Sequence, residues 1–200
     1  MKKLLLTGFV PFLEFPINPT EQIVKNLDEK IIGGYQVYGC ILPVDFSESA
    51  AKCLEYLEQI QPDVVISLGL AAGRTKITPE RIAINCKDGG PDNRGVQVQD
   101  ERIVEEGPAA YFSTLPVRRF VNVLNEKGYP AQISNTAGTY LCNNVMYSIL
   151  HKVQCENMPV RAGFVHLPAS HELAIQKPTL PSWSQEDLQK AVICMIEVLD

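Results

Sequence analysis

The stretch DVVISLGL, residues 63–70, is the feature that most constrains the fold of this chain. Beyond its first residue it is almost continuously apolar. A strand with one face in water alternates apolar and polar residues, whereas a strand covered on both faces does not. The stretch therefore predicts a strand in the interior of a sheet that lies between two layers of helices.

Segments with helical spacing alternate with other apolar strands along most of the chain. We expect strands at residues 3–9, 35–44, 61–70, 78–86, 131–135 and 161–168. We expect helices after Asn18, at residues 47–60, 116–128 and 142–153, and after Ser184. Residues 87–108 are rich in Gly, Asp and Asn, which is typical of a loop. The alternation predicts a phosphorylase/hydrolase-like α/β fold, a three-layer α/β/α sandwich with a mixed, mostly parallel sheet.

Length and composition restrict the class of protein. The 200 residues, 46% of them hydrophobic, predict one globular domain over residues 1–200. A net charge of −5 argues against a nucleic-acid partner, which favours a basic patch. The apolar run after Lys3 breaks at Thr7-Gly8 and Pro11, too early for a signal peptide, and no stretch approaches the roughly 20 apolar residues of a membrane span. We therefore expect a soluble, cytoplasmic protein without a membrane partner.

One of the six cysteines differs from the others in its position. None of them forms a CxxC pair, so no metal site is expected. Four lie on apolar periodic segments and are interpreted as core residues: Cys40, Cys53, Cys155 and Cys194. Cys142 instead follows the turn TAG at the start of a helix, where free N–H groups and partial positive charge favour a thiolate. A buried structural cysteine is the alternative.

A reactive thiol requires a base, and the chain has three histidines. His151 lies within a helix beside a lysine and is interpreted as solvated. His171 is expected in a loop. His166 ends the apolar stretch RAGFVHLP, so it lies at the same sheet edge as Cys142. The third group that orients the imidazole in such sites is not identified by spacing alone.

Several long motifs resemble those of the pyroglutamyl peptidase I family. GLAAGRTKITPERIAIN, residues 69–85, resembles the segment with the family's catalytic glutamate, and ISNTAGTYLCNNVMY, residues 133–147, resembles the segment with its nucleophile. The family's histidine motif is matched by GFVHLP, residues 163–168, and its first strand and loop by TGFVPFLEFPINPT, residues 7–20. The resemblance spans nearly the whole chain.

The resemblance implies a thiol-dependent exopeptidase that removes N-terminal pyroglutamate from peptides and proteins. It assigns the catalytic roles to Cys142 as nucleophile, His166 as base and Glu80 as the group that orients the imidazole. The reaction it implies proceeds through an acyl-enzyme and needs no metal or cofactor. It also implies a homo-oligomer, often a tetramer.

The family's substrate group is a flat, neutral lactam, which suits a pocket with apolar or aromatic walls. The resemblance places six residues at this pocket: Phe9, Phe12, Asn18, Leu70, Ala71 and Tyr140. The two aromatic residues of the first loop and Tyr140 would form the walls. Leu70 and Ala71 would contribute backbone contacts to the lactam. For Phe9, at a strand end, a core position is the alternative.

One segment departs from the family pattern. Many bacterial members carry NxxDARIPDN after the glutamate, with an arginine near the active site. This chain reads NCKDGGPDN, one residue shorter, with Gly89-Gly90 in the arginine region and Arg94 out of register. We expect the glycines to make this loop mobile.

Two other functions are compatible with α/β layering. A nucleoside phosphorylase-like enzyme would need a phosphate loop, and TGFVPF lacks the glycine pattern of one. A catalytically silent binding protein would tolerate loss of Cys142, His166 or Glu80, and all three are present. The peptidase is therefore the favoured interpretation.

Overall fold

The computed structural model describes residues 1–12 and 14–199. The strands of the main sheet are β1 (Lys2–Phe9), β2 (Ile31–Ile32), β3 (Tyr35–Leu42), β4 (Val64–Leu70), β5 (Thr78–Pro79) and β8 (Arg161–Leu167). Their spatial order is β2-β3-β1-β4-β8-β5. Two small sheets pair β6 (Ile82–Ile84) with β7 (Ala110–Phe112), and β9 (Ala169–Ser170) with β10 (Ser182–Trp183).

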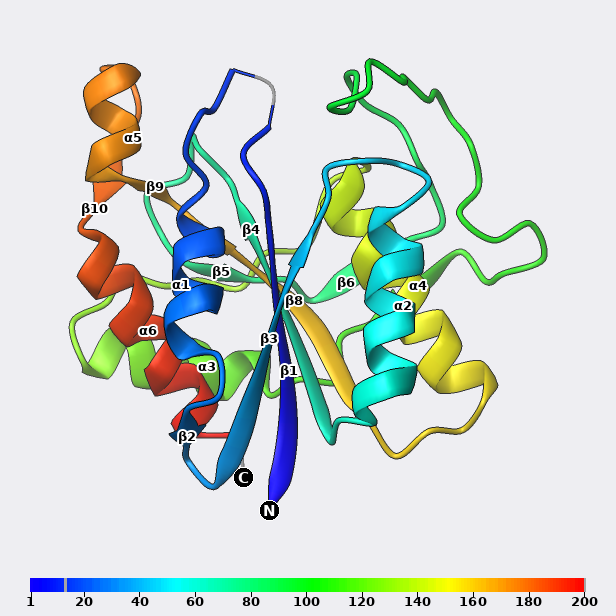
Figure 1. Cartoon of the computed structure of the whole chain (residues 1–200), viewed down its shortest axis with the longest axis horizontal. Coiled ribbons are helices and arrows are strands. Elements are labelled where there is room, and N and C mark those ends of the chain that lie inside the picture. The colour runs from blue at the N-terminus through cyan, green and yellow to red at the C-terminus, as the bar shows by residue number, and fades with distance from the viewer. Residues whose placement is uncertain (13, 200) are drawn as a thin grey trace.

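Helices cover both faces of the main sheet. They are α1 (Pro19–Leu27), α2 (Ser49–Ile60), α3 (Val117–Glu126), α4 (Leu141–Cys155), α5 (His171–Gln176) and α6 (Gln185–Glu197). Figure 1 shows α1, α3 and α6 on one side of the sheet and α2 and α4 on the other. The predicted three-layer arrangement is confirmed. Within the described residues, no helix combines the length and apolar character needed to cross a bilayer.

The apolar strands serve both layers because successive side chains of a strand point to opposite faces. In β1, Leu4 and Leu6 belong to the core cluster beneath α1, α3 and α6, and Leu5 belongs to the cluster beneath α2 and α4. In β4, Ile66 and Val65 divide between the same two clusters. The continuous apolar run of β4 is therefore explained by burial on both faces.

The inner strands of the main sheet are parallel. β1 pairs with β3 and with β4, and β4 pairs with β8, all in parallel register. At the two edges, β2 and β5 pair antiparallel with β3 and β8. The carboxyl ends of β1, β3, β4 and β8 therefore meet at one edge of the sheet, the upper one in Figure 1.

Two predicted helix starts have the expected caps. The Asn18 side chain accepts a hydrogen bond from Thr20 N at 3.2 Å, with Pro19 as the first helical residue of α1. Ser184 Oγ accepts one from Asp187 N at 3.0 Å. Such bonds satisfy N–H groups that have no partner within the helix. Gly128, with a φ of +84°, follows the end of α3 as predicted.

Two predicted strands are wrong in detail. Residues 131–135 form no strand; Ala131 and Ser134 take part only in isolated bridges, to Ile77 and Glu80. The segment 78–86 divides into β5 and β6, because its first part pairs with β8 and its second part with β7. Glu80 lies between the two parts.

The core beneath α3 predicts a large difference between two phenylalanines. Phe120 is fully buried, whereas Phe112 is 67% exposed. Phe120→Ala should lower the free energy of unfolding by about 3–5 kcal/mol through lost burial and a cavity. Phe112→Ala should change it by only about 0.5 kcal/mol. Urea denaturation of both variants checks the assignment, and equal losses would contradict the core described here.

Candidate active site

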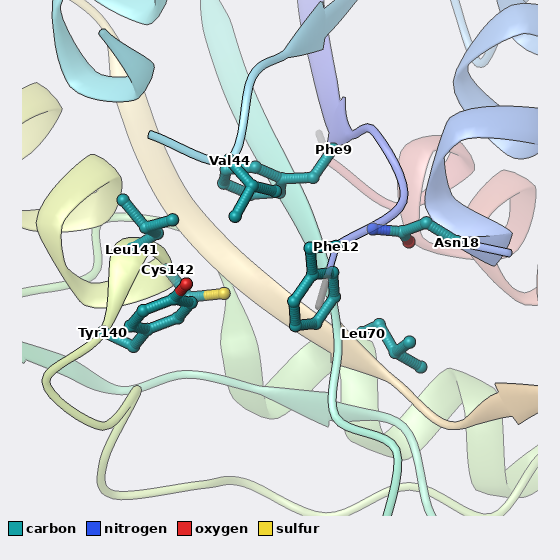
Figure 2. Close-up of a pocket in the computed structure, with 8 residues that line it drawn as sticks. All are labelled: Phe9, Phe12, Asn18, Val44, Leu70, Tyr140, Leu141 and Cys142. Atoms are coloured by element: carbon teal, nitrogen blue, oxygen red, sulfur yellow. The ribbon is translucent and has the colours of Figure 1, made fainter. Parts of the chain in front are cut away.

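A small pocket opens at the carboxyl edge of the sheet. The empty space within it, open solvent included, is about 260 Å³. Its lining comes from the ends of β1 and β4, the loops after β1 and β3, and the start of α4 (Figure 2): Phe9, Phe12, Asn18, Val44, Leu70, Tyr140, Leu141 and Cys142. Most of these side chains are apolar, so the pocket suits a small uncharged group.

Cys142 is the second residue of α4, and its sulfur points into the pocket between Tyr140 and Phe12 (Figure 2). The thiol lies against Gly69 of β4, where an added β-carbon would be 2.9 Å from Cys142 Sγ. Gly69 is the register partner of His166 in β8, so both residues direct their side-chain positions to the face that α4 covers. Parallel pairing thus brings Cys142 and His166 to the same place.

His166 is held by a buried carboxylate. Its Nδ1 lies 2.7 Å from Glu80 Oε1, and the Glu80 side chain is fully buried. An ionised carboxylate only accepts hydrogen bonds, so Nδ1 is the nitrogen that donates to Glu80, and in a neutral imidazole Nε2 would carry the lone pair. Glu80 reaches this position because its N–H donates to the carbonyl of Phe164, in the middle of β8, at 2.9 Å.

Arg74 is a fourth member of this group, and sequence reasoning missed it. Its Nη1 lies 2.7 Å from the same Glu80 Oε1 and also donates to the Thr78 hydroxyl. Arg74 lies within the motif that resembles the glutamate segment, but nothing in its spacing predicts that it folds back onto Glu80. The loop after β4 makes this possible, because Arg74 N donates to Ala71 O at 2.9 Å.

The surroundings of Cys142 oppose ionisation. Burial raises the pKa of its thiol to about 12 and the charge of Glu80 adds to this rise, while Arg74 and the backbone N–H of Cys142 act in the opposite direction. The expectation that the helix start alone makes this thiol acidic is therefore wrong, because burial outweighs it. No hydrogen bond joins Cys142 to His166 among the described residues. For this sulfur to act as a nucleophile, its proton would have to pass to a base.

The start of α4 is fixed in place while its first N–H groups remain without a side-chain cap. Tyr140, at the N-cap position, makes no capping bond. The buried Asn143 side chain accepts from Ile84 N at 2.9 Å and donates to Ile84 O and Cys86 O at 2.8 and 2.9 Å. The N–H groups of the first turn can therefore face an anion in a firmly held position.

Three of the predicted pocket residues differ in how they are placed relative to the pocket. Asn18 Nδ2 donates to Val10 O at 3.2 Å, which ties the loop after β1 to the start of α1. Ala71 N already donates to Leu167 O at 2.8 Å, and Ala71 does not line the pocket. Leu70 does line it. Sequence reasoning missed Val44 and Leu141, for which adjacency to the predicted strand end and to Cys142 was the available signal.

The shortened loop at residues 88–93 is tied down rather than loose. Asp88 N donates to Thr139 O at 2.9 Å, and the Tyr140 hydroxyl donates to Pro91 O at 2.9 Å. Gly89 lies on the Tyr140 ring, where an added β-carbon would be 2.7 Å from a ring atom. Arg94 pairs with Asp45 and does not line the pocket.

The remaining thiols and imidazoles lie outside the pocket. Cys53 and Cys194 are buried as expected, but Cys155 is exposed. His151 is not simply solvated: its Nδ1 lies 2.9 Å from the Tyr111 hydroxyl, and its ring stacks on Tyr147. His171 begins α5 rather than lying in a loop.

A thiol, an imidazole and a carboxylate at the carboxyl edge of an α/β sheet are the groups that thiol-dependent hydrolases use. Comparison with known proteins makes the class specific. The Pyroglutamyl peptidase family model matches residues 2–200, and the chain belongs to this family of peptidases. This membership favours the peptidase interpretation over a nucleoside phosphorylase-like enzyme.

Named relatives are similar over their whole length. The pyrrolidone-carboxylate peptidase of Oceanobacillus iheyensis is 52% identical over 200 residues, which cover 100% of both chains. That of Halalkalibacterium halodurans is 57% identical over 199 residues, covering 98% of each. The solved structure of pyrrolidone carboxyl peptidase from Thermococcus litoralis has a TM-score of 0.95 at 45% identity, covering 100% of this chain and 93% of that one.

The contact between Gly89 and Tyr140 predicts unequal effects for two neighbouring glycines. An alanine at 89 would press on the Tyr140 ring, whereas nothing lies within 4 Å of an added β-carbon at Gly90. Overpacking costs about 1–3 kcal/mol. Gly89→Ala should therefore raise the KM for a pyroglutamyl amide roughly fivefold or more, and Gly90→Ala should leave it unchanged. Equal KM values for both variants would contradict this account of the pocket wall.

Proposed function

We propose that this chain removes N-terminal pyroglutamate from peptides with Cys142 as nucleophile, His166 as general base and acid, and Glu80 as the residue that orients His166. One observation carries the proposal: the 2.7 Å contact between His166 Nδ1 and buried Glu80, at the strand position facing Cys142. Family membership supports the substrate.

In the first half of the reaction, Cys142 Sγ attacks the carbonyl carbon that joins the pyroglutamyl group to the next residue, and the lactam carbonyl is not attacked. His166 Nε2 takes the thiol proton, and the imidazolium is stabilised by Glu80. The negative charge that develops on the carbonyl oxygen faces the N–H groups at the start of α4. The bond to the leaving amine then breaks, His166 returns the proton to that nitrogen, and a thioester remains on Cys142.

In the second half, water replaces the departed peptide. His166 Nε2 accepts a proton from the water, whose oxygen attacks the thioester carbonyl carbon. The carbon–sulfur bond breaks, the proton passes to Cys142 Sγ, and pyroglutamate leaves. The raised pKa of the free thiol supports this order of events, because the sulfur holds its proton until the base removes it.

The pocket supports a neutral ring as the recognised group. Phe9, Phe12 and Tyr140 present aromatic surface, and none of the described residues that line the pocket has a charged side chain to bind an ammonium group. A pyroglutamyl lactam carries no such charge, whereas ordinary peptide N-termini do. Of the two expected backbone partners of the lactam, Leu70 lines the pocket and remains proposed, whereas Ala71 does not line it.

Three broader expectations stay predictions. We propose that residues 1–200 form a single pyroglutamyl peptidase domain, which the match over residues 2–200 supports. We also retain a cytoplasmic location and a homo-oligomeric state, with a tetramer as the expected assembly.

The proposed nucleophile predicts a contrast between two serine variants. Cys142→Ser should fold but lose turnover of a pyroglutamyl fluorogenic amide by roughly 10³-fold or more, because the hydroxyl is a far weaker nucleophile. Cys155→Ser changes an exposed thiol on the same helix and should keep full activity. Activity in Cys142→Ser, or equal loss in both, would refute the assignment.

The neutral pocket predicts strict selectivity between two similar rings. A prolyl amide has a charged secondary amine and lacks the lactam carbonyl, so buried partners would stay unpaired at roughly 1–3 kcal/mol each. We expect kcat/KM to fall by roughly 10²-fold or more relative to the pyroglutamyl amide. Fluorogenic amides of both acids measure this, and comparable rates would eliminate the proposed pocket chemistry.

A further inference from the structure

Arg74 is the cation nearest to the proposed catalytic residues. Its guanidinium makes three contacts: Nη1 with Glu80 Oε1 at 2.7 Å, Nη1 with the Thr78 hydroxyl, and Nη2 with Thr136 O at 3.4 Å. These partners come from the segment around β5 and from the turn before α4. Arg74 therefore links the segment that carries Glu80 to the segment that precedes Cys142.

The carboxylate beside Arg74 needs a compensating charge. The Glu80 side chain is fully buried, and its Oε1 receives both Arg74 and His166. Its Oε2 has no hydrogen-bond partner among the described residues. A buried carboxylate is costly unless it is paired. Among the described residues, Arg74 is the permanently charged cation that pairs with Glu80.

We propose that Arg74 is a positioning residue for catalysis, which pairs with Glu80, holds that carboxylate aimed at His166 and places a positive charge beside the proposed catalytic residues. The proposal rests on the function proposed above and goes beyond it, because it assigns an electrostatic role to a residue that does not touch the reacting atoms. The charge of Arg74 also lowers the pKa of the Cys142 thiol, against the larger effect of burial, so this charge acts on the proposed nucleophile as well as on Glu80.

Ionisable side chains face Arg74 and its partners from three elements. Glu80 faces it from the loop after β5, His166 from β8, and Cys142 and Tyr140 from the start of α4. Burial, and to a smaller extent the charge of Asp92, raises the pKa of Tyr140 to about 12. Tyr140 therefore stays neutral over the pH range of the experiment. Arg94, which pairs with Asp45 and donates to Ser47 Oγ at 2.7 Å, does not contact Glu80.

The sign of the expected pH effect follows from charge. Removing the Arg74 cation takes away a charge that lowers the pKa of the Cys142 thiol, so this thiol loses its proton less readily. The acid limb of the kcat/KM profile reports the loss of a proton that must leave before attack. Without Arg74 this limb moves to higher pH.

The test compares kcat/KM for a pyroglutamyl fluorogenic amide against pH in the full chain and in three variants. Arg74→Gln removes the charge, Arg74→Lys keeps it with fewer hydrogen bonds, and Arg94→Gln is the matched control on an arginine outside the cluster. We expect the acid limb to rise by about 1 pH unit in Arg74→Gln. Arg74→Lys should keep the limb in place with a lower kcat, and Arg94→Gln should match the parent chain.

A kcat/KM that is lower in Arg74→Gln by the same factor at every pH, with an unmoved acid limb, would overturn the proposal and indicate a purely structural residue. A limb that moves equally in Arg94→Gln would also overturn it. Should Arg74→Gln not fold, Arg74→Lys decides: a shifted limb or an unchanged kcat refutes the role. A parent chain without pyroglutamyl hydrolysis would instead contradict the proposed function, so the two failures are distinguishable.

Discussion

Parallel pairing of the inner strands is the constraint on which the candidate site depends. Because β1, β4 and β8 run in the same direction, Phe9, Leu70 and His166 arrive at one edge of the sheet. The register of β4 with β8 sets Gly69 against His166, and the space left by the missing side chain at Gly69 receives Cys142 Sγ. A one-residue slip would reverse the faces and separate these groups.

Electrostatics then determine how the grouped residues can react. The buried carboxylate of Glu80 needs a compensating positive charge. A thiolate at Cys142 would add a second negative charge nearby, and the raised pKa of this thiol reflects that cost together with burial. Arg74 pairs with the carboxylate, and in the proposed mechanism proton transfer to His166 at the moment of attack avoids a free thiolate beside it. Glu80 therefore faces a permanent cation and a transient one at a single oxygen, Oε1.

Much of this arrangement could be predicted from local sequence, and the rest depends on long-range contacts. The apolar run of β4 and the cap at Asn18 are local features, and both are confirmed. The family resemblance identified Glu80, which no spacing could select. The contact of Arg74 with Glu80 depends on the path of a loop, and the division of residues 78–86 depends on which strand each half meets. The pKa of Cys142 depends on burial, which a helix-start argument omits.

The most direct test of the central claim is to locate the thiol whose modification stops catalysis. Partial alkylation with iodoacetamide, followed by peptide mass spectrometry, gives the occupancy at each cysteine alongside residual pyroglutamyl-amide hydrolysis. The exposed Cys155 should be labelled without loss of activity. The account predicts that lost activity equals the occupancy at Cys142, one for one. Full alkylation of Cys142 with retained hydrolysis would contradict it.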